Sequence, residues 1–176
     1  LHAFSDSNWA RDSVDRKSIL GYCVYLGPNL ISWSAKKQSI VSQSFTKVEY
    51  RALDNATVEL TWLQQLLTDM HITSSFILEL WRDTLSAMAL ASNPVFHSRS
   101  KHIEIDCHFI RDKVVVKLID LKYVPTTNQV ADIFTKPLST SRFLNLKDKL
   151  LVQPCPISLQ GTAKIHTQAS FGKRLF

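Results

Sequence analysis

Two glutamates lie within the apolar stripe of a long segment that has helical periodicity. Glu49 comes four residues after Phe45 and four before Leu53, so its side chain falls among apolar neighbours rather than opposite them. A buried carboxylate is costly unless a cation or hydrogen-bond donors accompany it. The pattern therefore indicates either a bound metal ion or a tie to a nearby lysine or backbone amide. Glu59 shares the stripe near its edge, and placement alone does not choose between the two.

Two aspartates stand at the ends of segments that have strand character. Asp83 follows the apolar run Phe76–Trp81, and Asp6 lies two residues after Phe4, on the same face of the first expected strand. Acids in such places either cap the next helix or face a ligand. A helical crossover between the two segments allows their strands to lie parallel and adjacent. We therefore expect both carboxyl groups at the strand ends where ligands gather in α/β sheets.

Asp132 is a third aspartate to consider. It lies on the polar side of a short helical segment whose apolar side is formed by Val130, Ile133 and Phe134, a position typical of a solvated acid. Carboxylates that converge without opposing lysine or arginine are the ligands that Mg²⁺ prefers. Two such ions can activate a water molecule and stabilise the leaving oxygen of a phosphodiester. Convergence of these acids would therefore indicate phosphodiester hydrolysis.

The elements that must position these acids follow the order β-β-β-α-β-α-α-β-α-α. Strands are expected at Leu1–Trp9, Ser18–Leu26, Leu30–Ala35, Phe76–Trp81 and Leu118–Val124. Helices are expected at Ser44–Met70, Thr84–Ala91, Ile103–Lys117, Asn128–Thr135 and Ser139–Val152, with a polar loop at Ser92–Lys101. A hairpin meander followed by alternating helices and strands predicts an α/β fold, with one mixed sheet and helices on its faces.

Composition favours one domain, over residues 1–152. After Val152 the periodicity stops, and a content of Pro, Gly, Thr and Gln predicts a disordered tail over residues 153–176. The net charge is +6, and Lys164, Lys173 and Arg174 of the tail supply three of these charges, so charge alone is weak evidence for a nucleic-acid partner. The chain begins with Leu1, which favours a piece of a longer reading frame.

Membrane and metal-thiolate chemistry are not indicated. No apolar run approaches the length of a membrane span, so no membrane association is expected. The three cysteines form no Cys-x-x-Cys pair, and the spacing of His97, His102 and His108 fits no standard zinc site. These features favour a reducing, intracellular compartment.

Five blocks carry a resemblance to a known family. They are Phe4–Ala10, Asp15–Ser18, Ile31–Gln38, Asn93–Ile103 and Ala131–Leu138. In this order they resemble the blocks of the ribonuclease H domain of copia-type retrotransposon Pol polyproteins, and the resemblance covers about residues 2–148. Five ordered blocks are a far more specific signal than one motif.

The resemblance implies a ribonuclease H-like fold, in which a five-stranded mixed sheet begins as an antiparallel meander and continues with parallel strands. It implies an endonuclease that hydrolyses the RNA strand of RNA–DNA hybrids during reverse transcription, with two Mg²⁺ ions, or Mn²⁺, as cofactors and no small-molecule cofactor. The metal-binding catalytic carboxylates would be Asp6, Glu49, Asp83 and Asp132. Glu49 is favoured over Glu59 because Val48-Glu49-Tyr50 resembles the family's Ala-Glu-Tyr.

Partners follow from the same resemblance. They are the RNA–DNA hybrid and the adjoining reverse transcriptase domain of the parent polyprotein, in a cytoplasmic particle or the nucleus. A hybrid is gripped through phosphates and 2′-hydroxyls across its shallow minor groove. Candidates for these contacts lie in the best-matching loops, whose alternative role is that of solvated polar segments: Lys36, Lys37, Arg99, Lys101 and His102.

Departures from the family pattern leave two rival interpretations open. Thr84 and Leu85 stand where the family usually has Asn-Gln, and Arg82 and Lys47 add positive charge near the expected site. These changes fit a catalytically decayed remnant that acts only as a nucleic-acid-binding or interaction module. A transposase or integrase core is the second rival. The order of the acids argues against it, because here Glu49 lies between Asp6 and Asp83, whereas those enzymes place their glutamate last.

Overall fold

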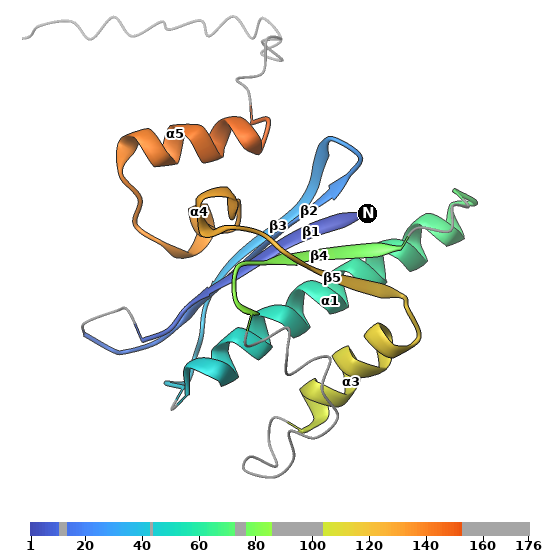
Figure 1. The fold of residues 1–176 in the computed structure, drawn as a ribbon, viewed down its shortest axis with the longest axis horizontal. Helices are drawn as coiled ribbons and strands as arrows, with labels where there is room; N and C mark the ends of the chain where they lie inside the picture. The colour runs from blue at the N-terminus through green and yellow to red at the C-terminus, as the bar shows by residue number, and fades with distance from the viewer. Residues whose placement is uncertain (11–13, 43, 73–76, 86–103, 153–176) are drawn as a thin grey trace, which may run out of the picture.

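The computed structural model describes residues 1–10, 14–42, 44–72, 77–85 and 104–152. These residues form one five-stranded sheet in the order β3-β2-β1-β4-β5, with helices on both faces (Figure 1). The α/β fold class and the mixed five-stranded sheet expected from the sequence are confirmed.

The first three strands form an antiparallel meander: β1 (His2–Asn8), β2 (Ile19–Leu26) and β3 (Asn29–Lys37). The tight turn between β2 and β3 contains Gly27, whose φ of 57° lies in the left-handed region that glycine adopts without strain. Two parallel strands then extend the sheet beyond β1. They are β4 (Leu78–Arg82), which pairs with β1, and β5 (Ile119–Tyr123), which pairs with β4.

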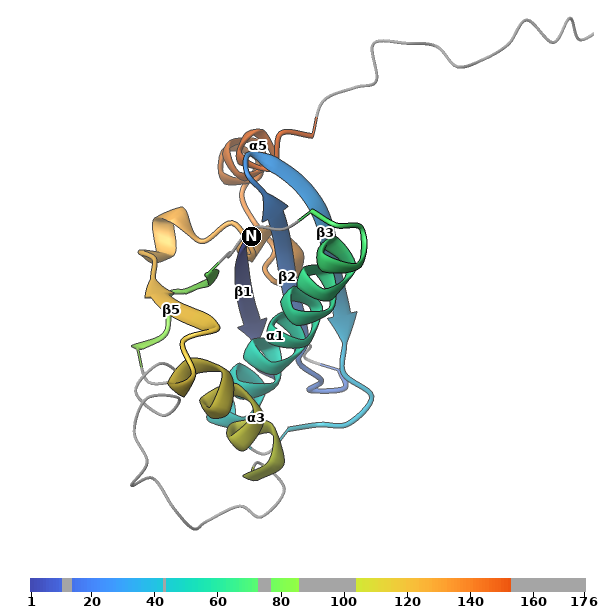
Figure 2. The same cartoon turned by 90° about the vertical axis from the view of Figure 1, so that its right-hand side faces the viewer.

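The larger core lies on the face covered by α1 (Phe45–Asp69) and α3 (Glu104–Val115), which lie side by side in both views (Figures 1 and 2). The helical spacing of apolar residues along α1 places them against the sheet. Buried members of this core come from both helices and from four strands, and they include Ala3, Val24, Leu53, Ala56, Leu60, Leu78, Leu80, Ile110 and Ile119.

The opposite face carries two shorter helices, α4 (Asp132–Thr135) and α5 (Thr140–Lys149). Their core is smaller and contains Cys23, Tyr25, Val130 and Leu150. A Cβ placed on Gly21 of β2 would lie 2.7 Å from the Cβ of Phe134 and 2.8 Å from Cγ2 of Thr135. The absence of a side chain at Gly21 therefore lets α4 pack directly on β2. This contact sets how close Asp132, at the start of α4, lies to the sheet.

The single helix expected at Asn128–Thr135 is wrong. The structure has a 3-10 turn, η1 (Thr126–Asn128), and α4 begins only at Asp132. Gln129 between them has an extended backbone, with ψ of 104°. Its side chain donates to the backbone oxygen of Ser5 in β1 and accepts from the amide of Ala131. A contact with a distant strand therefore overrides the local helical pattern.

The other expected elements match the observed ones to within a few residues. Three expectations lie outside the described residues, wholly or in large part: the helix at Thr84–Ala91, the loop at Ser92–Lys101 and the tail over residues 153–176. The domain boundary after Val152 therefore stays a prediction.

Candidate active site

Three aspartates converge where β1 and β4 run side by side. The parallel register pairs Phe4 with Trp81, which brings Asp6 and Asp83 to the same end of the sheet. Asp132, at the start of α4, approaches from the face opposite α1. One carboxylate oxygen from each aspartate lies within 4.8 Å of the other two. Mg²⁺ binds oxygen at about 2.0–2.1 Å, so small side-chain movements would bring a set of this size onto one divalent cation.

Burial strongly perturbs the carboxyl group of Asp6. Its side chain is almost fully buried, and burial raises its pKa from the ordinary 3.8 to about 6. The positive charge of Lys136 and a hydrogen bond donated by the Thr135 hydroxyl act in the opposite direction, and the neighbouring charges of Asp132 and Asp83 add to the rise. A proton or a bound cation that neutralises the Asp6 carboxylate is therefore favoured at this site.

Two basic side chains already partner these acids. The Lys136 ammonium lies 2.6 Å from Oδ1 of Asp132 and 3.5 Å from Oδ1 of Asp6. Arg142, on α5, lies 2.7 Å from Oδ2 of Asp132. Burial lowers the pKa of Lys136, but the charges of Asp6 and Asp132 outweigh it and raise that pKa above its ordinary value. Asp132 is thus buried and ion-paired, and the solvated position considered from the sequence is wrong.

The sequence pattern had a usable signal for one of these bases. Lys136 follows Asp132 by four residues, a spacing that brings side chains together on a helix. Arg142 carries no such signal, because its contact depends on how α5 packs beside α4. The described partners of Asp83 are uncharged hydroxyl groups: Thr126 donates a hydrogen bond of 3.2 Å to its Oδ2, and Thr84 donates one of 3.4 Å to its Oδ1.

Glu49 has different partners and is not a member of the three-carboxylate group. Its carboxylate is ion-paired with the guanidinium of Arg82 and accepts a hydrogen bond from the hydroxyl of Ser7. Glu49 and Arg82 are both buried. The alternative in which a basic side chain accounts for a buried Glu49 matches this geometry, and the role of Glu49 as a metal ligand stays a prediction. Glu59 accepts a hydrogen bond of 2.6 Å from Ser32 on β3, away from the aspartates.

The candidate nucleic-acid contacts are placed only in part. Lys36 and Lys37 are exposed at the end of β3, and the Lys37 ammonium lies 2.9 Å from Oδ2 of Asp15. Arg99, Lys101 and His102 lie outside the described residues. All five stay predictions.

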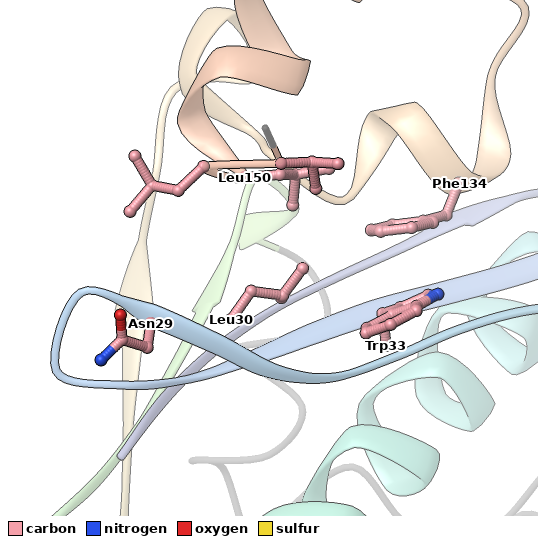
Figure 3. A pocket seen from close by; sticks show the side chains of 7 residues that line it. Asn29, Leu30, Trp33, Phe134 and Leu150 are labelled. Atoms are coloured by element: carbon pink, nitrogen blue, oxygen red, sulfur yellow. The ribbon is translucent and has the colours of Figure 1, made fainter. Parts of the chain in front are cut away.

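A separate apolar cavity of about 510 Å³ lies between the β2–β3 hairpin, α4 and the end of α5 (Figure 3). Its lining consists of Asn29, Leu30, Trp33, Phe134, Leu150, Leu151 and Val152. None of these side chains titrates, and the lining contains no carboxylate, so the cavity is no rival for the catalytic site. Among the described helices, none has the length and apolar character that a membrane span requires.

Three curated plant proteins are similar to the chain over most of its length. The retrovirus-related Pol polyproteins from transposons RE2 and RE1 of Arabidopsis thaliana are each 46% identical to it, over 94% and 90% of this chain. The retrovirus-related Pol polyprotein from transposon TNT 1-94 of Nicotiana tabacum is 31% identical over 81% of this chain. The chain spans 11% of the length of each. No protein-family model matches it.

Solved structures show the same fold. LC11 ribonuclease H1, isolated from compost by a metagenomic approach, has a TM-score of 0.56 at 16% identity, covering 86% of this chain and 97% of that chain. In complex with an RNA/DNA hybrid, LC11 ribonuclease H1 has a TM-score of 0.52 at 14% identity, covering 76% of this chain and 92% of that chain. At these identities the similarity shows the fold alone, and it confirms the ribonuclease H-like fold expected from the sequence.

Proposed function

We propose that this chain, which belongs to the ribonuclease H segment of copia-type retrovirus-related Pol polyproteins, hydrolyses the RNA strand of RNA–DNA hybrids with divalent metal ions. The observation that carries the proposal is the convergence of Asp6, Asp83 and Asp132 to within 4.8 Å at one end of the sheet. The proposed site is just beyond the paired segment of β1 and β4, at the carboxyl end of β4.

Bound Mg²⁺ or Mn²⁺ would supply an activated water molecule and stabilise the leaving oxygen of the phosphodiester. Asp6, Asp83 and Asp132 would hold the ion. In the metal-free chain, Lys136 pairs with Asp6 and Asp132, and Arg142 pairs with Asp132. Once a cation takes that role, their N–H groups become available for phosphate oxygens, which basic side chains bind well.

Hybrid binding would use backbone contacts rather than base recognition. Lys36 and Lys37 at the exposed end of β3 are the described candidates, together with Arg99, Lys101 and His102. LC11 ribonuclease H1, which shares the fold, has been solved with an RNA/DNA hybrid. The adjoining reverse transcriptase domain would be the second partner, and the site of action would be a cytoplasmic particle or the nucleus.

The test is cleavage of a hybrid that is labelled on its RNA strand. The purified chain should cut it with Mg²⁺ and not with EDTA, and Asp6→Asn should abolish cleavage because ligands of one ion act as a unit. Lys149→Gln, which alters a lysine that donates to Asn128, serves as the matched control and should cut like the parent. A parent that binds the hybrid without cutting it, in Mg²⁺ and in Mn²⁺, would contradict the nuclease proposal.

The second candidate is a non-catalytic remnant that only binds nucleic acid or proteins. It is favoured by one observation: each buried acid of the expected set, Asp6, Glu49 and Asp132, already has a basic partner within the chain. Such a chain would bind the hybrid with equal affinity in EDTA and in Mg²⁺. The same cleavage assay, combined with a binding titration, separates the two candidates.

A further inference from the structure

Arg82 is a fully buried arginine at the end of β4. Alternation along the strand places it on the same face as Leu78 and Leu80, which belong to the core beneath α1. A guanidinium in this position has lost its hydration and needs an anionic partner. Among the described residues, its Nε finds no hydrogen-bond partner. Glu49 is the anion that it reaches.

Arg82 contacts both the side chain and the backbone of Glu49. Nη2 of Arg82 donates to the Glu49 carboxylate, and Nη1 donates to the backbone oxygen of the same residue. The Ser7 hydroxyl donates to the other carboxylate oxygen. Each carboxylate oxygen of Glu49 therefore accepts a hydrogen bond from a group of the protein.

The direction of approach separates Glu49 from the aspartates. Ser7 and Asp6 are consecutive in β1, so their side chains point to opposite faces of the sheet. Ser7 contacts Glu49 on the α1 side, whereas Asp6 contacts Thr135 and Lys136 on the α4 side. A divalent ion beside Glu49 would also face the positive charge of Arg82, and like charges repel strongly in a buried site.

We propose that Arg82 is a positioning residue that holds Glu49 out of the metal site. The chain then has one tight divalent-ion site, made by Asp6, Asp83 and Asp132, while binding of a second ion is suppressed. This inference rests on the proposed function, because it requires that the three aspartates bind a divalent ion. It adds that the number of bound ions is set by Arg82.

The experiment is a titration of the metal-free full chain with Mn²⁺, in which free Mn²⁺ is measured by electron paramagnetic resonance. The parent should bind one ion tightly. Arg82→Met keeps the volume of the side chain and removes its charge, so Glu49 is released. This variant should bind a second ion about tenfold more tightly than the parent does. The double variant Arg82→Met with Glu49→Gln should return to the parent's behaviour.

Two further variants control for charge and for folding. Lys122→Met removes a positive charge that contacts Glu79 and Asp120, and it should leave Mn²⁺ binding unchanged. Glu49→Gln alone keeps a hydrogen-bond acceptor for Arg82, and it should leave the first ion's affinity unchanged. If circular dichroism shows that Arg82→Met does not fold, the Mn²⁺ affinity of Glu49→Gln, compared with that of the parent, tests the inference.

The outcomes distinguish the inference from the proposed function. If Asp6→Asn leaves Mn²⁺ binding intact, the three-aspartate site and the proposed function fail. If Asp6→Asn removes binding and Glu49→Gln weakens the first ion equally, Glu49 is a ligand and the inference alone is overturned. If the double variant still binds the second ion more tightly than the parent does, the inference is also overturned. The gain in affinity would then come from the change in net charge and not from Glu49.

Discussion

Asp6 is the residue whose protonation state should control the metal-free site. Its pKa of about 6 in the folded chain compares with an ordinary value of 3.8. Between these values the folded chain keeps the proton that the unfolded chain has lost. The Asp6 contribution to stability is therefore present below pH 3.8 and is lost as pH rises through about 6.

We expect the free energy of unfolding of the parent to fall by up to about 3 kcal/mol from this group between pH 4 and 7, relative to Asp6→Asn. The amide cannot ionise, so the variant lacks this contribution. Urea unfolding of both proteins in EDTA, across this pH range, measures the difference. Parallel stability curves for the two proteins would show that Asp6 titrates normally.

In the metal-free chain, the Lys136 ammonium takes the role of a metal ion between Asp6 and Asp132. Replacing it by Gln should lower the metal-free stability by about 1–3 kcal/mol, because two buried carboxylates lose their shared partner. The same change should enlarge the rise in melting temperature that Mg²⁺ produces, since the ion no longer competes with an ammonium group. Thermal melts in EDTA and in millimolar Mg²⁺ test both effects. Lys149→Gln is the matched control, and an equal Mg²⁺ response in the two variants would refute competition.

At the scale of elements, the packing of α4 on β2 decides where Asp132 lies. Gly21→Ala would place a methyl group within 2.8 Å of Phe134 and Thr135, so α4 must move outward. We expect a loss of about 1–3 kcal/mol in the free energy of unfolding and weaker Mn²⁺ binding, because Asp132 moves with its helix.

Gly27→Ala provides the comparison for this variant. No atom lies within 4 Å of a Cβ at Gly27, and the cost there comes only from its φ of 57°. This second variant should lose stability yet bind Mn²⁺ like the parent. Equal Mn²⁺ affinity in both glycine variants would show that α4 does not position the ion.

At the scale of the whole molecule, we propose that residues 1–152 are the folding unit. Removal of residues 153–176 should leave the melting temperature unchanged, because both cores of the described residues lie within 1–152. It should also reduce the salt dependence of hybrid binding if Lys164, Lys173 and Arg174 contact phosphate. Differential scanning calorimetry of the two chains tests the boundary. A fall of several degrees would move the boundary toward the C-terminus.

The sequence alone was sufficient for the order of strands and for the long helix α1. Alternation and helical spacing report which side chains face a core, and these patterns are local. The helical crossover between the two segments allowed β1 and β4 to be expected as adjacent parallel strands, with Asp6 and Asp83 close together, and the structure has this arrangement. The start of α4 was not predictable in this way, because Gln129 bonds to Ser5 across the fold.

The sequence by itself determined the family and the fold, and it supplied the candidate acids as predictions. Only the tertiary structure decided which partner each acid has. Glu49 meets Arg82, and Asp132 meets Arg142, through contacts between elements that are distant in the chain. Electrostatic pairing depends on distances of a few Å and on the loss of water around each charge. Both quantities exist only after helices pack on the sheet, so residue types and spacing cannot specify them.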